Sequence, residues 1–272
     1  MSDNNPQKQS PSYRLAALDQ DFILGDSTRG VRFLLEYEKA EDHLRAWGVL
    51  STIVVFGSAR TRPAPDRPAP AAAPPPTAAF ARQVERNARW YDEARRFGRI
   101  ASERGGALRN DRGGRRNVIA TGGGGGIMEA ANRGAADAGA PSIGFNIRLP
   151  MEQEPNPYTT PELTFQFHYF AMRKMHLAMR AAALVVFPGG FGTMDELFEI
   201  LTLTQTRKSP HVPIVCFDRS YWTRVVNFEA LLEEGMISAA DLALFSFADS
   251  AEEAWRTLVE RGLTTEFASR AD

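Results

Sequence analysis

Two glycine-rich loops, each placed between an apolar strand-like run and a helical pattern, constrain the fold of this chain more than any other feature. The first loop follows residues 117–121 and contains five consecutive glycines, residues 122–126. The second loop, residues 188–192, follows the apolar run 183–187. A strand that passes through a glycine turn into a helix is typical of βαβ units. The two loops therefore predict a parallel sheet.

The rest of the chain alternates in the same way. Strand-like apolar runs are found at residues 52–56, 117–121, 142–147, 183–187, 213–218 and 244–247. Helical patterns are found at residues 31–49, 80–104, 127–138, 170–180, 192–206, 222–234 and 251–261. This order predicts an α/β fold: a doubly wound, Rossmann-like parallel sheet with helices on both faces. The strand at residues 244–247 is expected at an edge, and the helix at residues 31–49 forms a helical N-terminal extension.

The domain organisation follows from the same alternation. We expect residues 1–30 to be a flexible N-terminal tail and residues 31–265 to form a single Rossmann-like domain. That domain contains a Pro/Ala-rich insertion at about residues 61–79, with seven prolines between residues 63 and 76. Such a segment has few backbone donors and few core-forming side chains, so an exposed insertion is expected.

Composition excludes several classes of partner. With 32 basic and 33 acidic residues, the net charge of −1 offers no general attraction to nucleic acid or to an anionic membrane. No apolar run approaches the ~20 residues of a membrane span. The single cysteine, Cys216, cannot form an internal disulfide, which favours a reducing, cytoplasmic location. The histidines form no ligand pair with Cys216, so no metal site is expected.

The glycine loops suggest a phosphate site. In doubly wound sheets, ligands bind outside the carboxyl ends of the strands, where glycines let the backbone approach and helix N-termini attract anions. A glycine, Gly57, also follows directly after the strand-like run at residues 52–56. Tight turns without a ligand are the alternative reading, but several such loops facing one crevice favour phosphate. The candidate contacts are Gly57, Ser58, Gly123, Gly124, Gly125, Gly126, Gly189, Gly190, Phe191, Gly192 and Thr193.

Familiar phosphate motifs do not fit these loops. The dinucleotide fingerprint needs glycine at its sixth position, where counting from Gly122 gives Ile127. No lysine follows either loop as a P-loop requires. Ser58 lacks the Gly-x-Ser-x-Gly elbow of serine hydrolases. The phosphate is therefore expected to belong to a mononucleotide or a sugar phosphate.

Glu196 and Arg173 are the charged residues best placed for chemistry. Glu196 lies in the first turns of the helix after the second loop and shares an i, i+4, i+7 stripe with Ile200 and Leu203, so it is expected to project inward. A carboxylate there could stabilise an oxocarbenium-like sugar or accept a proton from water. The planar guanidinium of Arg173 suits a phosphate or a carboxylate. A simpler alternative for Glu196 is the ordinary preference for acidic residues in the first turn of a helix. For Arg173 the simpler alternative is a surface salt bridge.

The motif at residues 188–196, Pro-Gly-Gly-Phe-Gly-Thr-Met-Asp-Glu, resembles the Pro-Gly-Gly-x-Gly-Thr-x-x-Glu signature of the LOG (Lonely Guy) family. Residues 121–135 resemble the family's other glycine loop, and the Arg-Lys pair of Arg173 and Lys174 has the family's spacing to the signature. The resemblance covers about residues 50–235. The proline-rich insertion departs from the compact family pattern.

This resemblance implies a function and roles for residues. LOG proteins hydrolyse cytokinin nucleotides, and often AMP, to free base and ribose 5-phosphate. By resemblance Arg173 and Glu196 are the catalytic pair, with no cofactor, in a homodimer or higher homo-oligomer. Substrate contacts are implied for Lys174, Gly190, Phe191, Gly192, Thr193 and Thr202, with Glu154 as a looser match. The alternative is a non-catalytic binder of a nucleotide or of molybdenum cofactor on the same fold, which would not need the Arg173–Glu196 pair.

Members of the family have also been labelled lysine decarboxylases. A pyridoxal-phosphate enzyme needs a lysine that forms a Schiff base with the cofactor. The only central candidates are Lys174 and Lys208, and neither lies in a recognisable cofactor motif. The sequence therefore argues against that chemistry.

Overall fold

The structure is a computed structural model that describes residues 3–64, 77–109, 113–150 and 154–265. Its centre is a seven-stranded, fully parallel sheet in the order β4-β3-β2-β1-β5-β6-β7. The strands are β1 (Thr52–Phe56), β2 (Val118–Thr121), β3 (Ser142–Ile147), β4 (Thr164–Phe167), β5 (Ala181–Val186), β6 (Ile214–Phe217) and β7 (Phe245–Ala248). The predicted doubly wound α/β fold is confirmed.

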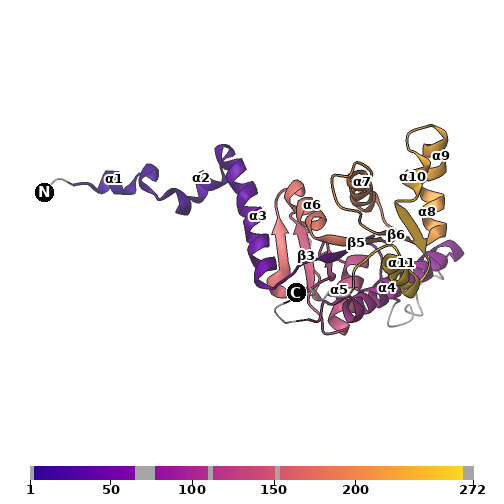
Figure 1. The fold of residues 1–272 in the computed structure, drawn as a ribbon. Helices are drawn as coiled ribbons and strands as arrows, with labels where there is room; N and C mark the ends of the chain where they lie inside the picture. Colours follow the sequence, from indigo (N-terminus) through magenta and orange to yellow (C-terminus); the bar gives the residue numbers. More distant parts are fainter. Residues whose placement is uncertain (1–2, 65–76, 110–112, 151–153, 266–272) are drawn as a thin grey trace, which may run out of the picture.

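Helices cover both faces of the sheet (Figure 1). One face carries α4 (Ala78–Gly105), α5 (Ile127–Asp137) and α11 (Ala251–Glu260). The other carries α3 (Arg29–Ala46), α6 (Phe170–Met179), α7 (Phe191–Gln205), α8 (Arg219–Val225) and α9 (Phe228–Glu233), with α10 (Ala239–Leu242) next to them. Each face has its own buried apolar cluster.

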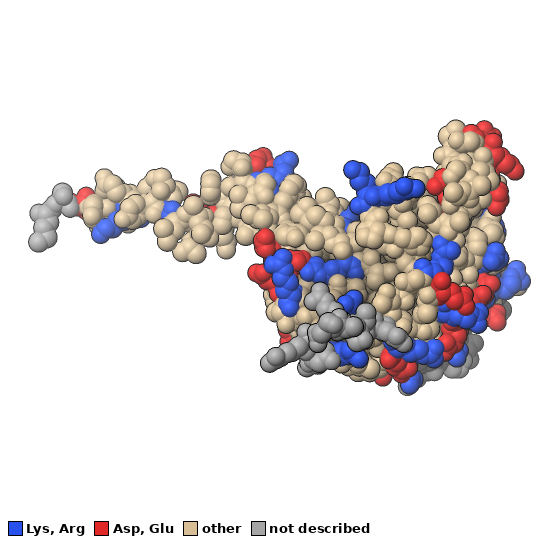
Figure 2. Space-filling view, viewed as in Figure 1, with Lys and Arg blue, Asp and Glu red and all other residues tan. Residues whose placement is uncertain are grey.

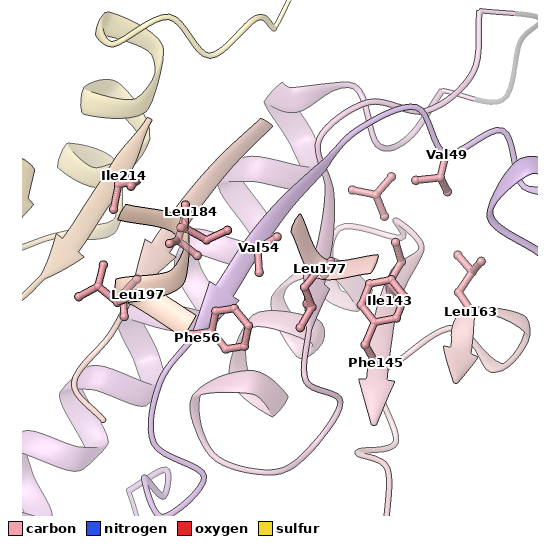
Figure 3. Packing of buried hydrophobic residues seen from close by; sticks show 14 of the residues in the cluster. Val49, Val54, Phe56, Ile143, Phe145, Leu163, Leu177, Leu184, Leu197 and Ile214 are labelled. Atoms are coloured by element: carbon pink, nitrogen blue, oxygen red, sulfur yellow. The ribbon is translucent and has the colours of Figure 1, made fainter. Parts of the chain in front are cut away.

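Strand β1 is buried on both faces of the sheet, which accounts for the continuous apolar sequence of the central strands. Val54 and Phe56 point into the cluster under α6 and α7, which Figure 3 shows in close-up. Ile53 and Val55 point into the cluster under α4 and α5. Because successive side chains on a strand face opposite sides, a strand covered on both faces must be apolar at every position.

The order of the strands locates the ligand-binding end of the sheet. From β1 the chain moves outward through β2, β3 and β4, and then returns across the sheet to β5 on the other side of β1. The connections therefore diverge between the carboxyl ends of β1 and β5. A doubly wound sheet has its crevice at this topological switch point.

Two expectations about the elements were wrong. The edge strand β4 was not predicted, because four residues that alternate between buried Phe165 and Phe167 and exposed Gln166 give too short a signal. The single helix expected at residues 222–234 is two helices. It breaks at Val226, which is extended, and at Asn227, whose side chain caps α9 by accepting the Ala230 N–H.

The helical N-terminal extension is present. Helix α3 packs against α6. The residues before α3 extend away from the domain as an arm of short helices (Figure 1). The arm consists of α1 (Asn5–Gln9), η1 (Pro11–Tyr13), η2 (Ala16–Leu18), α2 (Gln20–Leu24) and η3 (Asp26–Thr28). The flexibility of residues 1–30 and the domain limits remain predictions. Most of the proposed insertion, residues 65–76, lies outside the described residues.

Two further properties concern the described residues only. No helix among them has both the length and the apolar character needed to cross a membrane. In the same ranges, no group of three or more His, Cys, Asp or Glu side chains is arranged to hold a metal ion. The one cysteine, Cys216, is buried in β6, and burial raises the pKa of its thiol.

Candidate active site

The three glycine-bearing strand ends meet at the switch point. The Ser58 N–H after β1 donates to the Pro188 carbonyl after β5, at 3.0 Å. The Ser58 carbonyl accepts the N–H of Ile127, the first residue of α5, at 3.1 Å. The loop after β1 is thus hydrogen-bonded to both of the other loops.

The glycines of these loops have two different roles. Gly126 has a φ of +70°, and a Cβ there would lie 2.2 Å from the Ser58 carbonyl oxygen. A Cβ on Gly189 would meet the Thr193 hydroxyl. Glycine is therefore needed at these two positions so that the loops can pack. At Gly190 and Gly192, by contrast, a Cβ would meet nothing within 4 Å. These two glycines leave open space in front of the backbone.

A cavity of about 790 Å³ occupies that space. It opens at the carboxyl ends of β1 and β5, where the strand order predicts a ligand. Of the residues expected to bind or act on a ligand, those that line it are Gly57, Ser58, Arg173, Gly189, Gly190, Phe191, Gly192, Thr193 and Glu196. Gly123, Gly124, Gly125 and Gly126 do not line it, although their loop supports its wall.

The N-terminus of α7 faces this cavity. Gly190 is the N-cap of the helix and supplies no side chain to cap it. In the described part of the chain, the N–H groups of Gly190, Phe191 and Gly192 have no hydrogen-bond acceptor. Free amides at the positive end of a helix of this length form a natural anion site. The cavity therefore has a phosphate-sized set of donors at one end.

Arg173 and Glu196 form a buried ion pair in the wall of the same cavity. Nη2 of Arg173 donates to Oε1 of Glu196 at 2.9 Å, and the two side chains are 13% and 4% exposed. Helix α6 supplies Arg173 and helix α7 supplies Glu196, so the pair joins two elements. Burial raises the pKa of Glu196 to about 7, although the positive charges of Arg173 and Lys174 oppose the shift. A carboxyl group with this pKa can exchange a proton near neutral pH.

A second arginine–glutamate pair, between α3 and the end of α6, shifts the pKa of its carboxyl group in the other direction. Arg180 donates through Nη1 and Nη2 to both carboxylate oxygens of Glu41 at 2.8 and 2.7 Å, and its Nε donates to the Val49 carbonyl. The side chains of Arg180 and Glu41 are 14% and 5% exposed, and Oε1 of Glu41 also accepts Nε of Arg45 at 3.0 Å. Here the hydrogen bonds from Arg180 lower the pKa of Glu41, against the effect of burial.

The two arginines also differ in the number of hydrogen bonds that their side chains donate. Within the described residues, Arg173 has one hydrogen-bond partner, and its buried Nε has none. Arg180 uses three nitrogens. An incompletely paired arginine beside a carboxyl group of raised pKa, at a cavity, is typical of a functional site.

Three residues that the family resemblance implies as substrate contacts do not line the cavity. The Lys174 Nζ contacts Asp195 at 2.8 Å and Glu199 at 3.2 Å, outside the cavity lining. The Thr202 hydroxyl is exposed and donates to the Phe198 carbonyl at 2.7 Å. Glu154 is exposed in the connection after β3. Their roles as substrate contacts remain predictions.

The surroundings of Lys174 also bear on the lysine decarboxylase label. Burial alone would lower its pKa, but the hydrogen bond to Asp195 and the charges of Glu196 and Glu199 raise it overall. A lysine that attacks a carbonyl needs a lowered pKa so that the free amine is present. Lys174 has the opposite environment.

Eight residues that line the cavity were not among the expected contacts. These are Phe56, Ala59, Arg60, Met128, Met194, Phe198, Val225 and Val226. Arg60 could have been noticed, because it follows the first glycine turn by three residues. The two valines lie at the end of α8, which is far from the glycine loops in the sequence. No local signal connects them to the site.

Comparisons with known proteins agree with the motifs. The family model described as "Possible lysine decarboxylase" matches residues 128–258. The probable cytokinin riboside 5′-monophosphate phosphoribohydrolase LOG4 of Oryza sativa subsp. japonica is 30% identical over 147 residues, 53% of this chain and 63% of its own length. LOG3 of Arabidopsis thaliana, a cytokinin riboside 5′-monophosphate phosphoribohydrolase, is 29% identical over 150 residues, 53% of this chain and 68% of its own.

A solved structure is also similar. It is the molybdenum cofactor binding protein from Rippkaea orientalis, at 16% identity and a TM-score of 0.47, over 79% of this chain and 97% of that chain. The match to the family model includes the signature at residues 188–196 and both members of the Arg173–Glu196 pair. Over this segment the chain is similar in sequence to proteins of the LOG family.

Proposed function

We propose that this protein is a nucleoside 5′-monophosphate phosphoribohydrolase: a cytokinin nucleotide or AMP reacts with water to give the free base and ribose 5-phosphate. The observation that carries the proposal is the buried Arg173–Glu196 pair, with a carboxyl pKa of about 7, in the same cavity as the free amides of α7. The activity for which the rice and Arabidopsis relatives are named supports the same reaction.

The lining of the cavity offers two kinds of chemistry. The free amides of Gly190, Phe191 and Gly192 suit the dianionic phosphate. Phe198, Val225 and Val226 supply apolar surface suited to a base. Glu196 lies on the same helix as the amides, buried in the wall. In this arrangement the phosphate anchors the nucleotide and directs its ribose toward the carboxylate.

The reaction can be written for these residues. The C1′–N bond breaks, and its electron pair leaves with the base, which takes up a proton from solvent that is later replaced by the one Glu196 gains from water. The sugar becomes oxocarbenium-like, and the carboxylate of Glu196 stabilises that charge. A water oxygen bonds to C1′ and gives a proton to Glu196. Arg173 is permanently charged and a poor proton donor, so its role is to orient Glu196 and to stabilise negative charge.

The proposal is tested by a panel of nucleoside 5′-monophosphates with chromatographic identification of the products. We expect free base and ribose 5-phosphate from AMP or from an N6-substituted analogue. The matched nucleosides, which lack the phosphate, should release base much more slowly. Tight binding of nucleotides without any release of base would instead support the alternative, a carrier of a nucleotide or of molybdenum cofactor.

We propose further that the protein is a homodimer or a higher homo-oligomer. The N-terminal arm exposes large apolar side chains, including Tyr13, Leu15, Leu18 and Leu24, each about 70% exposed. Figure 2 shows the arm as a mostly uncharged projection from the domain. Exposed apolar surface of this kind favours association. The cytoplasmic location favoured by the lone cysteine is part of the same proposal.

Light scattering of the purified protein tests the assembly. We expect a mass of at least twice the 30.1 kDa of one chain. Removing the arm before α3 should lower that mass or weaken the association. A monomeric mass at all accessible concentrations would contradict this part of the proposal.

A further inference from the structure

A network of aromatic and polar side chains lies behind the glycine loop that precedes α7. The hydroxyl of Tyr221, on α8, donates to the Gly189 carbonyl at 2.6 Å. Asp218 caps α8: its Oδ1 accepts the Tyr221 N–H at 2.9 Å and the Ser220 hydroxyl at 2.7 Å. Its Oδ2 accepts Nε1 of Trp90, on α4, at 2.8 Å. The network thus connects helices on the two faces of the sheet to one peptide group of the loop.

This network fixes the position of the Tyr221 ring. The ring of Trp90 contacts it edge-on at 5.8 Å, and the ring of Trp222 contacts it edge-on at 5.4 Å. Asp218 is buried and has a φ of +69°, a backbone conformation that residues other than glycine rarely adopt. A buried residue keeps such a conformation only where its surroundings hold it strongly. The hydroxyl of Tyr221 is therefore in a well-defined place.

Because the Tyr221 hydroxyl fixes the direction of the Gly189 carbonyl, it also fixes the direction of the next N–H group, that of Gly190. In a trans peptide the C=O of one residue and the N–H of the next point in opposite directions. Gly189 and Gly190 line the cavity, whereas Tyr221 does not. A carbonyl of Gly189 that points back at Tyr221 directs the N–H of Gly190 away from Tyr221, toward the cavity.

We propose that Tyr221 is a positioning residue for the phosphate site: its hydroxyl holds the Gly189–Gly190 peptide so that the Gly190 N–H donates to the phosphate of the ligand. This inference rests on the proposed function, because it needs a phosphate at the N-terminus of α7. Tyr221 touches neither the substrate nor the reacting atoms. It acts through the backbone of the loop.

The test is Tyr221→Phe, which removes the hydroxyl and keeps the ring between the two tryptophans. Calorimetry should show that ribose 5-phosphate and AMP bind about tenfold more weakly than to wild type, while adenosine binding is unchanged. In assays of base release the KM for AMP should rise by about the same factor, with kcat within about twofold of wild type.

Tyr91→Phe is the matched control. The Tyr91 hydroxyl donates to Oε1 of Glu129 at 2.7 Å, and neither residue lines the cavity. This variant loses a tyrosine hydrogen bond in another part of the protein, so it should bind all three ligands as wild type does. Trp90→Phe, which removes the donor to Asp218, should weaken phosphate binding in the same direction as Tyr221→Phe but less.

The outcomes separate this inference from the proposed function. If wild type bound neither ribose 5-phosphate nor AMP, the proposed function would fail and the inference with it. If wild type bound both and Tyr221→Phe bound them equally well, only the positioning role would be overturned. Equal weakening of adenosine and ribose 5-phosphate in Tyr221→Phe would show a general loss of structure and would also overturn it.

Discussion

We expect Glu196→Gln to lower kcat for base release by a factor on the order of 10² or more, while the affinity for the nucleotide changes little. The amide keeps the size of the side chain and can still accept a hydrogen bond from Arg173. It cannot carry the negative charge that stabilises an oxocarbenium-like sugar, and it cannot take a proton from water. Steady-state rates with AMP, together with calorimetric affinities for the same ligand, measure the two effects separately.

Glu199→Gln is the control for this variant. Glu199 lies less than one turn further along α7 and loses the same charge on substitution, but its contact is with Lys174 outside the cavity. It should retain most of the wild-type kcat. Turnover of Glu196→Gln close to that of wild type would show that the carboxylate has been assigned the wrong role.

The raised pKa of Glu196 adds a dependence on pH to the same comparison. The ionised carboxylate is the active form, so the rate of base release should rise with pH through about 7. Stability should change in the opposite direction. Between about pH 4.5 and 7 the folded protein holds a proton that the unfolded chain has lost, so the free energy of unfolding falls as pH rises. Denaturant unfolding should show wild type losing stability relative to Glu196→Gln over this range.

The sequence predicted the central part of the sheet because two-sided burial leaves a strong signal. The run of β1 is apolar at four consecutive positions after Thr52, since both of its faces are covered. The edge strand β4 has no such run, and its pairing with β3 depends on a partner distant in sequence. The break between α8 and α9 depends on the side chain of Asn227, which the apolar periodicity around it conceals.

The candidate site was predictable where it lies on one element and not where several elements converge. The signature at residues 188–196 places the free amides and Glu196 on one helix, so local spacing was sufficient. Arg60, Val225 and Val226 come to the cavity from the loop after β1 and from the end of α8. Their positions depend on the order of the strands, which a single sequence does not reveal. Lys174 shows the reverse: it is adjacent to Arg173 in sequence, yet its amine turns to Asp195 and Glu199.

The second large effect is expected for Arg173→Ala. Removing Arg173 leaves the buried Glu196 carboxyl group without its hydrogen-bonded positive partner, so this carboxyl group takes up a proton more readily. The pKa of Glu196 should therefore rise further, because the positive charge that opposes the effect of burial is gone. We therefore expect kcat/KM for AMP to fall by a factor on the order of 10² or more, and the rise of activity with pH to move to higher pH.

Arg180→Ala is the control that separates the general effect of losing a buried arginine from the effect on the cavity. It breaks another buried pair at the end of α6, although Glu41 keeps its hydrogen bond from Arg45, and neither Glu41 nor Arg180 lines the cavity. Measured on the folded fraction, its activity and its pH profile should match those of wild type. Arg173→Lys should restore part of the charge effect on Glu196 without the planar fork. If Arg180→Ala lost as much activity as Arg173→Ala, the loss would come from the packing of α6, and Arg173 would have only a structural role.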